Sequence, residues 1–257
     1  NLRADISLDY RGDFDFSHRK RQLADLVLRD EGVTADQDRE IMHEYVTKIR
    51  AALDGKIQRY ADSESPDVIF SVLERGPVKY VFMVNDKRTY GDRFGKWKTF
   101  HERGVEQTVT VKLRTQPSDA VVYDLRAHSR VDAVVTDDTM QIVRTLGPCD
   151  GTILAVYPRA LREVRCEAPK SIAQGKTGKI TVRVLDAAGK CAGTQPLRVR
   201  LIDPSGEESQ YSDYYATSDG EYTLEVKPAL NDQKGAWKIE ALDLTSGLAG
   251  NASFEVR

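Results

Sequence analysis

The sequence predicts a mainly β protein, with two consecutive antiparallel β-sandwich domains preceded by a short α/β segment that holds two helices. Two observations support this prediction. Helical periodicity is confined to roughly the first 60 residues, and beyond them short apolar or alternating runs recur every 8 to 12 residues or so. We therefore expect an α/β segment at residues 1–60, a polar linker at 61–66, a β-sandwich at 67–158 and an immunoglobulin-like sandwich at 159–257.

The first segment contains signals for one strand and two helices. Residues 4–10 alternate apolar and polar side chains, which predicts a half-buried strand. A helix follows, with Asp15 or Ser17 as its N-cap and an end near residue 30. The second helix is marked more clearly, because residues 34–37 form a T-x-x-Q capping box and Gly55 is a natural stop. Together they look like an incomplete unit, such as the end of a larger α/β domain.

The first sandwich begins with a hairpin whose turn is Arg75-Gly76-Pro77. Its strands are expected at 67–74, 78–84, 106–114, 120–125, 130–136, 140–145 and 152–157. The second sandwich has its strands expected at 163–168, 178–186, 196–203, 208–215, 221–228, 236–242 and 252–256. Trp237 is in phase with the inward positions of its strand, so we expect it to anchor the core. Seven short strands in this length predict an immunoglobulin-like architecture, although the antibody pattern of Cys, Trp and Cys is absent.

Composition excludes several classes of partner. The chain has 257 residues and a formal net charge of −2, so bulk charge favours neither nucleic acid nor an anionic membrane. No apolar run approaches the roughly 20 residues of a membrane span, so we expect none. Asn1 is not an initiator methionine and no leader follows it, which suggests a processed form or an excised piece.

The three cysteines, Cys149, Cys166 and Cys191, do not form a disulfide framework. Free, partly buried thiols are the expectation, and a single bridge between Cys166 and Cys191 is the alternative. This cysteine pattern favours neither an oxidising nor a reducing compartment.

No residue set specifies a reaction, and we expect neither a catalytic residue nor a cofactor or metal. His43-Glu44 begins like a zinc signature, but Thr47 stands where the second histidine is needed. The tripeptide at residues 11–13 matches an integrin-binding sequence, and a turn with glycine explains it as well. No nucleophile elbow or phosphate-binding loop is present. Sequence alone brings together no two of the candidate glycosidase carboxylates, Asp86, Asp92, Asp124, Asp137 and Asp138.

The segment from Asp86 to Arg103 combines aromatic and basic side chains more densely than the rest of the chain, and it is expected to be a loop. Long loops without secondary structure are usually functional or form interfaces. One alternative is ligand binding, because exposed rings stack on sugars and cations hold anionic groups. The other is that the segment covers a sheet edge or packs against a neighbouring domain. The candidate ligand-binding residues are Tyr90, Arg93, Phe94, Trp97 and Lys98.

Several short motifs resemble a known domain. The strand pair DVIFSVLERGPVKYVFMVND contains a hairpin that ends in Asn85, Tyr123-Asp124-Leu125 occupies a later strand, and residues 147–151 precede a closing strand. This order resembles the C-terminal antiparallel β domain of large bacterial glycoside hydrolases. The resemblance covers residues 66–158 and implies a non-catalytic domain that packs beside a catalytic barrel, which this chain does not contain.

The last domain looks like the immunoglobulin-like or macroglobulin-type modules of bacterial surface and secreted proteins. The G-x-W-x-I strand at residues 235–239 and the hairpin at 243–248 carry this resemblance. The two resemblances together imply a non-catalytic region of a larger secreted or envelope protein, located outside the cell or in its envelope. Its expected partner is a preceding catalytic domain, which the resemblance implies acts on carbohydrate, or a neighbouring chain of the same protein. The alternatives are a structural protein of a filament, coat or surface layer, and a polysaccharide-binding module that uses the 86–103 segment.

Overall fold

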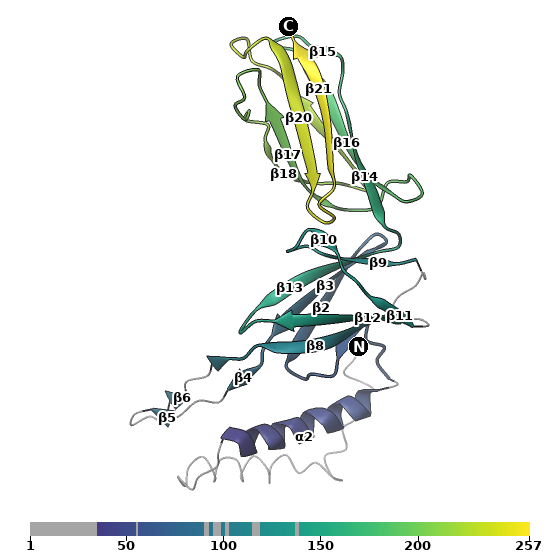
Figure 1. Ribbon diagram of the computed structural model, residues 1–257, viewed down its shortest axis with the longest axis vertical. Helices are drawn as coiled ribbons and strands as arrows, with labels where there is room; N and C mark the ends of the chain where they lie inside the picture. Colours follow the sequence, from purple (N-terminus) through teal and green to yellow (C-terminus); the bar gives the residue numbers. More distant parts are fainter. Residues whose placement is uncertain are drawn as a thin grey trace. The chain divides into compact units, whose positions relative to one another are not determined.

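In the computed structural model of the protein, the structure describes residues 35–54, 56–89, 93–94, 99–100, 103–114, 119–136 and 139–257 (Figure 1). The chain divides into two compact units. Unit 1 comprises Asn1–Gln58 with Thr89–Arg103, and unit 2 comprises Arg59–Arg88 with Gly104–Arg257. No helix in the described part of the chain is long and apolar enough to cross a membrane.

Unit 1 contains the helix α2, Ala35–Leu53. The second predicted helix is thereby confirmed, and it begins directly after Thr34 of the expected capping box. His43 is exposed on this helix, as an isolated histidine on an amphipathic helix would be. The strand expected at residues 4–10, the first helix and the tripeptide at 11–13 all lie outside the described residues.

Unit 2 is mainly β and begins with a sandwich of two sheets. Sheet I has the strand order β1 (Ala61–Ser63), β8 (Gln107–Arg114), β12 (Thr139–Leu146) and β11 (Val134–Thr136). Sheet II has the order β10 (Ser129–Arg130), β9 (Val121–Asp124), β13 (Gly151–Tyr157), β3 (Val78–Asn85) and β2 (Val68–Arg75). Every pairing within these two sheets is antiparallel.

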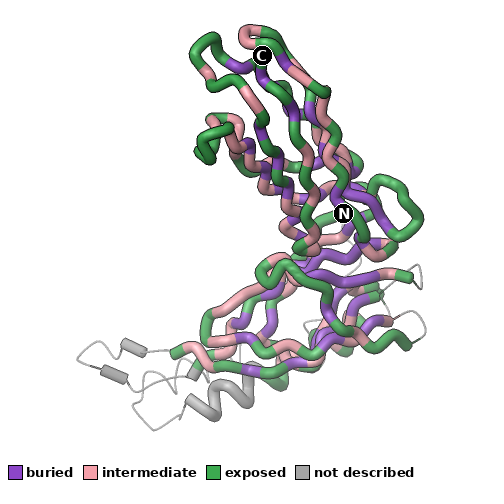
Figure 2. Tube along the Cα trace, turned by 45° about the horizontal axis from the view of Figure 1, so that its top comes forward, coloured by how far each residue is buried: buried purple, intermediate pink, exposed green. Residues whose placement is uncertain are grey.

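The period-two patterns seen in the sequence bury one face of each strand. Val111 and Leu113 of β8 are fully buried, while their neighbours along the strand are half-buried or exposed. They meet Val81 of β3 and Leu154 of β13 in one core cluster between the sheets. Figure 2 shows the same alternation of buried and exposed residues along the strands. Fully burying such a side chain stabilises the fold by about 1.5 to 3 kcal/mol.

Two expectations for this sandwich are wrong. Residues 61–63, expected to be linker, form the edge strand β1, in which Ala61 and Ser63 are buried against β8. Their polar composition predicts a linker rather than a buried strand. The Ser63 side chain can nevertheless be buried, because its hydroxyl donates a hydrogen bond to the Ser65 carbonyl at 3.0 Å. The run 130–136, expected to be one strand, crosses from sheet II to sheet I and therefore splits into β10 and β11.

The second sandwich follows directly. Sheet III has the order β14 (Leu161–Glu167), β16 (Gly178–Asp186) and β19 (Glu221–Val226). Sheet IV has the order β15 (Ser171–Ile172), β21 (Ala249–Val256), β20 (Gly235–Asp243), β17 (Pro196–Ile202) and β18 (Asp213–Ala216). Two sheets of this order form an immunoglobulin-like sandwich, so the predicted mainly β fold class is confirmed.

Trp237 on β20 is only 3% exposed, which confirms the prediction that it anchors the core. Its indole Nε1 donates to the Gln233 carbonyl at 2.9 Å, and its ring lies 6.0 Å from that of Phe254.

The three cysteines are free, so the alternative of a bridge between Cys166 and Cys191 is wrong. Burial raises the pKa of the Cys166 thiol to about 11.

Two strands of the second sandwich differ from expectation. The run 208–215 pairs as a strand only from Asp213, because the preceding residues turn back onto β17, where the Ser212 hydroxyl accepts from the Leu201 amide at 2.9 Å. The two-residue strand β15 was not expected, and it pairs in parallel with β21. Such a short strand has too few residues to show periodicity.

Candidate functional site

The basic-aromatic segment is an antiparallel ribbon at the points where the structure describes it, and so the expectation of a loop without secondary structure is wrong. The strand β4 (Arg88–Thr89) pairs with β7 (Arg103–Gly104), and β5 (Arg93–Phe94) pairs with β6 (Thr99–Phe100). A ribbon of this kind satisfies its own backbone groups, which a long open loop cannot do. Of the candidate ligand-binding residues, Arg93 and Phe94 lie in β5 opposite Phe100 and Thr99, whereas Tyr90, Trp97 and Lys98 lie outside the described residues.

Asn85 is the last residue of β3 and precedes the segment 86–103 in the sequence, and it is only 1% exposed. The Asn85 side-chain amide lies within hydrogen-bond distance of the carbonyl oxygens of Val105, Leu146 and Gly147, at 2.8, 3.1 and 2.7 Å. Its Oδ1 accepts from the Gln107 side chain at 2.6 Å and from the Lys87 amide at 3.0 Å. Because Leu146 and Gln107 belong to sheet I, one side chain at the end of β3 joins both sheets of the first sandwich.

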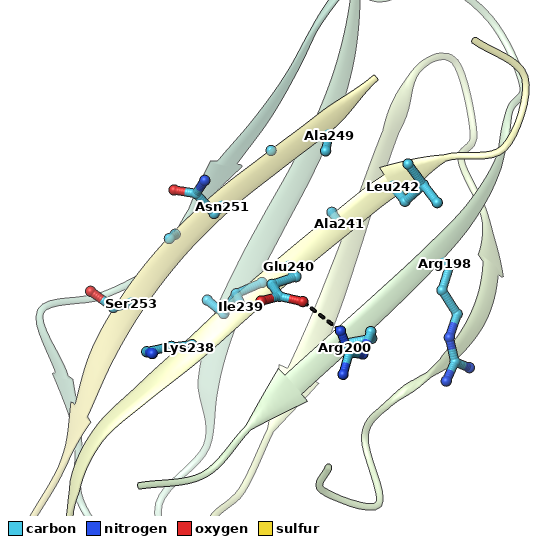
Figure 3. A pocket seen from close by; sticks show the side chains of 12 residues that line it. Arg198, Arg200, Lys238, Ile239, Glu240, Ala241, Leu242, Ala249, Asn251 and Ser253 are labelled. Carbon is cyan, nitrogen blue, oxygen red and sulfur yellow. Dashed lines mark hydrogen bonds and ion pairs between the residues drawn. The ribbon is translucent and has the colours of Figure 1, made fainter. Parts of the chain in front are cut away.

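A hollow lies on the outward face of sheet IV (Figure 3). It has a volume of about 640 Å³ and lies over β17, β20 and β21. The outward residues of β21 have small side chains, Ala249, Asn251 and Ser253, and stand opposite Leu242, Glu240 and Lys238 of β20. The difference in side-chain length between neighbouring strands produces the hollow, because the sheet backbone under small residues is not covered.

The charges around the hollow are largely paired. The Arg200 guanidinium contacts Glu240 and Glu208, each at 2.7 Å, and Arg198 contacts Glu208 at 3.1 Å. Lys238, which lies on β20 opposite Ser253 of β21, is exposed. The hollow therefore offers an amide, a hydroxyl, an ammonium and a carboxylate in one shallow surface, all of which can bond to a hydroxylated ligand.

Tyr214 lies at the far edge of the same face and is 65% exposed. The Arg198 guanidinium lies over its ring, 4.7 Å from the centroid. This arrangement extends the polar face of sheet IV from β21 to β18 with one exposed aromatic ring. Sequence reasoning missed these residues, although the alternation of small and long side chains on strands 249–256 and 235–243 is a signal that could have found them.

No protein-family model and no curated protein sequence matches this chain. Among solved structures, the filamin domain of Lin-41 is 18% identical with a TM-score of 0.29, and the match covers 36% of this chain and 91% of that domain. A putative membrane-anchored protein from Corynebacterium diphtheriae is 11% identical with a TM-score of 0.28, over 76% and 53% of the two chains. Red sea bream transglutaminase is 10% identical with a TM-score of 0.26, over 81% and 33%. Values this low establish no family, and the strand pairing described above defines the fold.

Within unit 2, a buried seam joins the two sandwiches. Val78, Tyr123 and Tyr157 of the first sandwich belong to the same core cluster as the interior of the second. The hydroxyls of Tyr80 and Tyr157 both donate to the Thr194 carbonyl, at 2.6 and 3.0 Å. The backbone amide at the start of β14 donates to the Tyr123 hydroxyl at 2.7 Å. Burial raises the pKa of Tyr157, so its hydroxyl retains the proton that it donates.

The hairpin after β20 completes the seam. Asp243 is fully buried, and its carboxylate accepts from the amides of Thr245 and Ser246 at 3.1 and 3.0 Å. Burial raises the pKa of Asp243, while the bonds from Ser246 and Thr245 oppose that rise. Gly247 has φ +75°, and a Cβ there would lie 2.7 Å from the His128 carbonyl oxygen of the first sandwich. A glycine is therefore required by backbone conformation and by close approach together.

The described carboxylates named in the sequence analysis have structural partners. Asp124 accepts from the amides of Arg126 and Ala127 and forms an ion pair with Arg144 at 3.4 Å. Asp86 forms an ion pair with Arg88. Asp92, Asp137 and Asp138 lie outside the described residues. Among the residues that the structure describes, no three His, Cys, Asp or Glu side chains gather as metal ligands would.

Proposed function

We propose that unit 2 is a non-catalytic β-sandwich region of a larger secreted or envelope protein, and that it supports a carbohydrate-active catalytic region outside this chain. The observation that carries this proposal is the buried seam between the sandwiches. Independent modules on a flexible tether need no shared core, whereas a support must hold its two parts in a fixed relation. The carbohydrate part of the proposal rests on the sequence resemblance of residues 66–158.

The support function predicts that the intact chain has no hydrolytic activity of its own. Assayed against a broad panel of glycosides at neutral and acidic pH, it should release no more product than a buffer blank. The reason is that the carboxylates of Asp86, Asp124 and Glu240 form ion pairs with neighbouring arginines, so none of the three is held as a free acid or nucleophile. Turnover that disappears on a single carboxylate substitution, such as Asp124→Asn or Glu240→Gln, would contradict the proposal.

A second candidate function is polysaccharide binding on the hollow of sheet IV. It is favoured by the exposed Asn251, Ser253 and Lys238, which offer hydrogen-bond donors above a shallow polar surface. A hydrogen bond to a charged group contributes about 1.5 to 3 kcal/mol, so Lys238→Ala should weaken polysaccharide binding about tenfold or more.

Affinity electrophoresis through gels containing soluble polysaccharides distinguishes the two binding surfaces. Lys238→Ala and Asn251→Ala should both reduce retardation if the hollow binds, and Trp97→Ala should reduce it if the ribbon binds. Thr223→Ala, which removes an exposed side chain of sheet III, is the matched control and should change nothing. Absence of retardation for the unmodified chain would remove this candidate.

A further inference from the structure

The edge strand β2 of sheet II differs from the other sheet edges in the described part of the chain. It has eight residues and pairs with β3 along its whole length without a bulge. The edge strands β1, β10, β11, β15 and β18 have four residues or fewer. Of the two longer ones, β14 has an irregularity between Leu161 and Glu163, and β19 carries Glu221 and Glu225. Short length, bulges and charges protect edges from pairing with another chain, and β2 lacks all three along its centre.

The outward face of β2 carries two large apolar side chains near its centre, one on each side of Ser71. Ile69 is 54% exposed and Leu73 57% exposed. Val84 of β3, opposite Ile69, is 46% exposed and continues this apolar surface, whereas Tyr80, opposite Leu73, is half-buried in the seam with the second sandwich. Exposed apolar residues gathered on one strand pair mark an interaction surface more often than scattered ones do.

The direction of the backbone groups shows what β2 can bind. The Asp86 amide donates to the Asp67 carbonyl at 2.8 Å, so the backbone N–H and C=O groups of Asp67 point toward the β3 side of the strand. Direction alternates along a strand, and therefore Ile69, Ser71 and Leu73 also bond to β3. The amides and carbonyls of the even-numbered residues, Val68, Phe70, Val72 and Glu74, point to the open edge, which is where an added strand would find them.

We propose that two copies of this chain pair through β2, antiparallel and around a two-fold axis at Ser71. Backbone bonds then join Phe70 of one copy to Val72 of the other, and Val68 to Glu74. On the outward face Ile69 stands opposite Leu73 of the second copy, and sheet II continues from one copy into the next. The contact is isologous, so it closes at two copies and uses up the open edge.

Charge and apolar pairing select this register. With the axis at Ser71, Asp67 of one copy faces Arg75 of the other, on the same side of the sheet as the apolar pair. Moving the axis to Val72 places Ile69 opposite Arg75, and moving it to Phe70 places Asp67 opposite Leu73. Both shifts set a charged residue against an apolar one, whereas opposite charges and apolar pairs stabilise neighbouring strands. A shift of the pairing by a single residue, which would set odd-numbered residues opposite even-numbered ones, is excluded, because it would turn the outward side chains of the second copy to the other face of the sheet.

Sedimentation equilibrium of the intact chain tests the association. We expect a monomer–dimer equilibrium with no larger species. Leu73→Lys, which places a charge in the apolar pair twice per dimer, should weaken dimerisation at least ~100-fold. Leu230→Lys is the matched control, because Leu230 is 79% exposed in another part of unit 2, and it should leave the equilibrium unchanged. A concentration-independent monomer, or equal effects of the two substitutions, would overturn the proposal.

Disulfide trapping tests the register. In a background with Cys149→Ser and Cys191→Ser, Ser71→Cys places two thiols opposite each other across the axis, and mild oxidation should give a covalent dimer. Leu73→Cys alone should not, since its opposite residue is Ile69, but a mixture of Leu73→Cys and Ile69→Cys chains should cross-link. Cross-linking of Leu73→Cys to itself, or none at Ser71→Cys, would overturn the register.

Discussion

Replacing Trp237 with alanine is expected to lower the free energy of unfolding by about 3 to 5 kcal/mol, the range for removing a large aromatic side chain from a core. Trp237 is 3% exposed, packs against Phe254 and donates its indole N–H to the Gln233 carbonyl. Its loss leaves a cavity in the middle of sheet IV that the surrounding strands cannot close. Urea unfolding followed by circular dichroism measures the change, provided that the slope of the transition is unaltered.

Two further variants make this result specific. Trp237→Phe keeps a ring in the core but loses the indole hydrogen bond, so it should cost less than Trp237→Ala. Tyr214→Ala removes an aromatic side chain that is 65% exposed, and it should cost no more than about 1 kcal/mol. If Trp237→Ala and Tyr214→Ala were equally tolerated, the buried position of Trp237 would be wrong.

Asn85→Ala should lower the free energy of unfolding by about 3 kcal/mol, because it leaves buried carbonyl groups and the Gln107 amide without their partner. Asn251→Ala is the matched control, since Asn251 is an exposed asparagine in a strand, and its effect should stay within about 0.5 kcal/mol. Asn85→Asp should be more harmful at neutral pH than Asn85→Ala, because it turns a carboxylate toward carbonyl oxygens.

The seam gives the Asn85 experiment a second readout. In a Trp97→Phe background Trp237 is the one remaining tryptophan, and it reports on the second sandwich while Asn85 lies in the first. Because one core cluster includes Val78, Tyr123, Tyr157 and the interior of the second sandwich, we expect both sandwiches to unfold together. The Trp237 fluorescence transition should then move to lower urea in Asn85→Ala. A Trp237 transition that does not move would contradict this coupling.

Local pattern predicted the parts of the fold that depend on one strand at a time. Ile180, Val182 and Val184 alternate with polar residues, and all three are fully buried on β16. The same logic placed Trp237 correctly, because a residue in phase with Ile239 must share its face. The hairpin of β2 and β3 was also evident, since two apolar runs flank a turn at Gly76, which has φ +57°.

The candidate site was predicted less well than the fold. The sequence drew attention to the segment 86–103 by its composition, but its description as a loop missed the pairing of β5 with β6. The hollow on sheet IV depends on which strands become neighbours, and Lys238 meets Ser253 only because β20 pairs with β21 in that register. Composition of a segment carries no information about what lies opposite it in a sheet.

Alternation of apolar and polar residues along the chain is enough to establish that this protein is mainly β, where most of its strands lie and which side chains face the core, because alternation is a local property. The pairing of distant strands, in contrast, establishes that residues 61–63 are a strand, that 130–136 changes sheets, and that Asn85 joins both sheets of the first sandwich. It also establishes that Tyr80 and Tyr157 share the Thr194 carbonyl across the seam and that, within the described part of the chain, no strand pairs with β2 on one side. These features arise from pairings between residues far apart in the chain, which local periodicity does not specify.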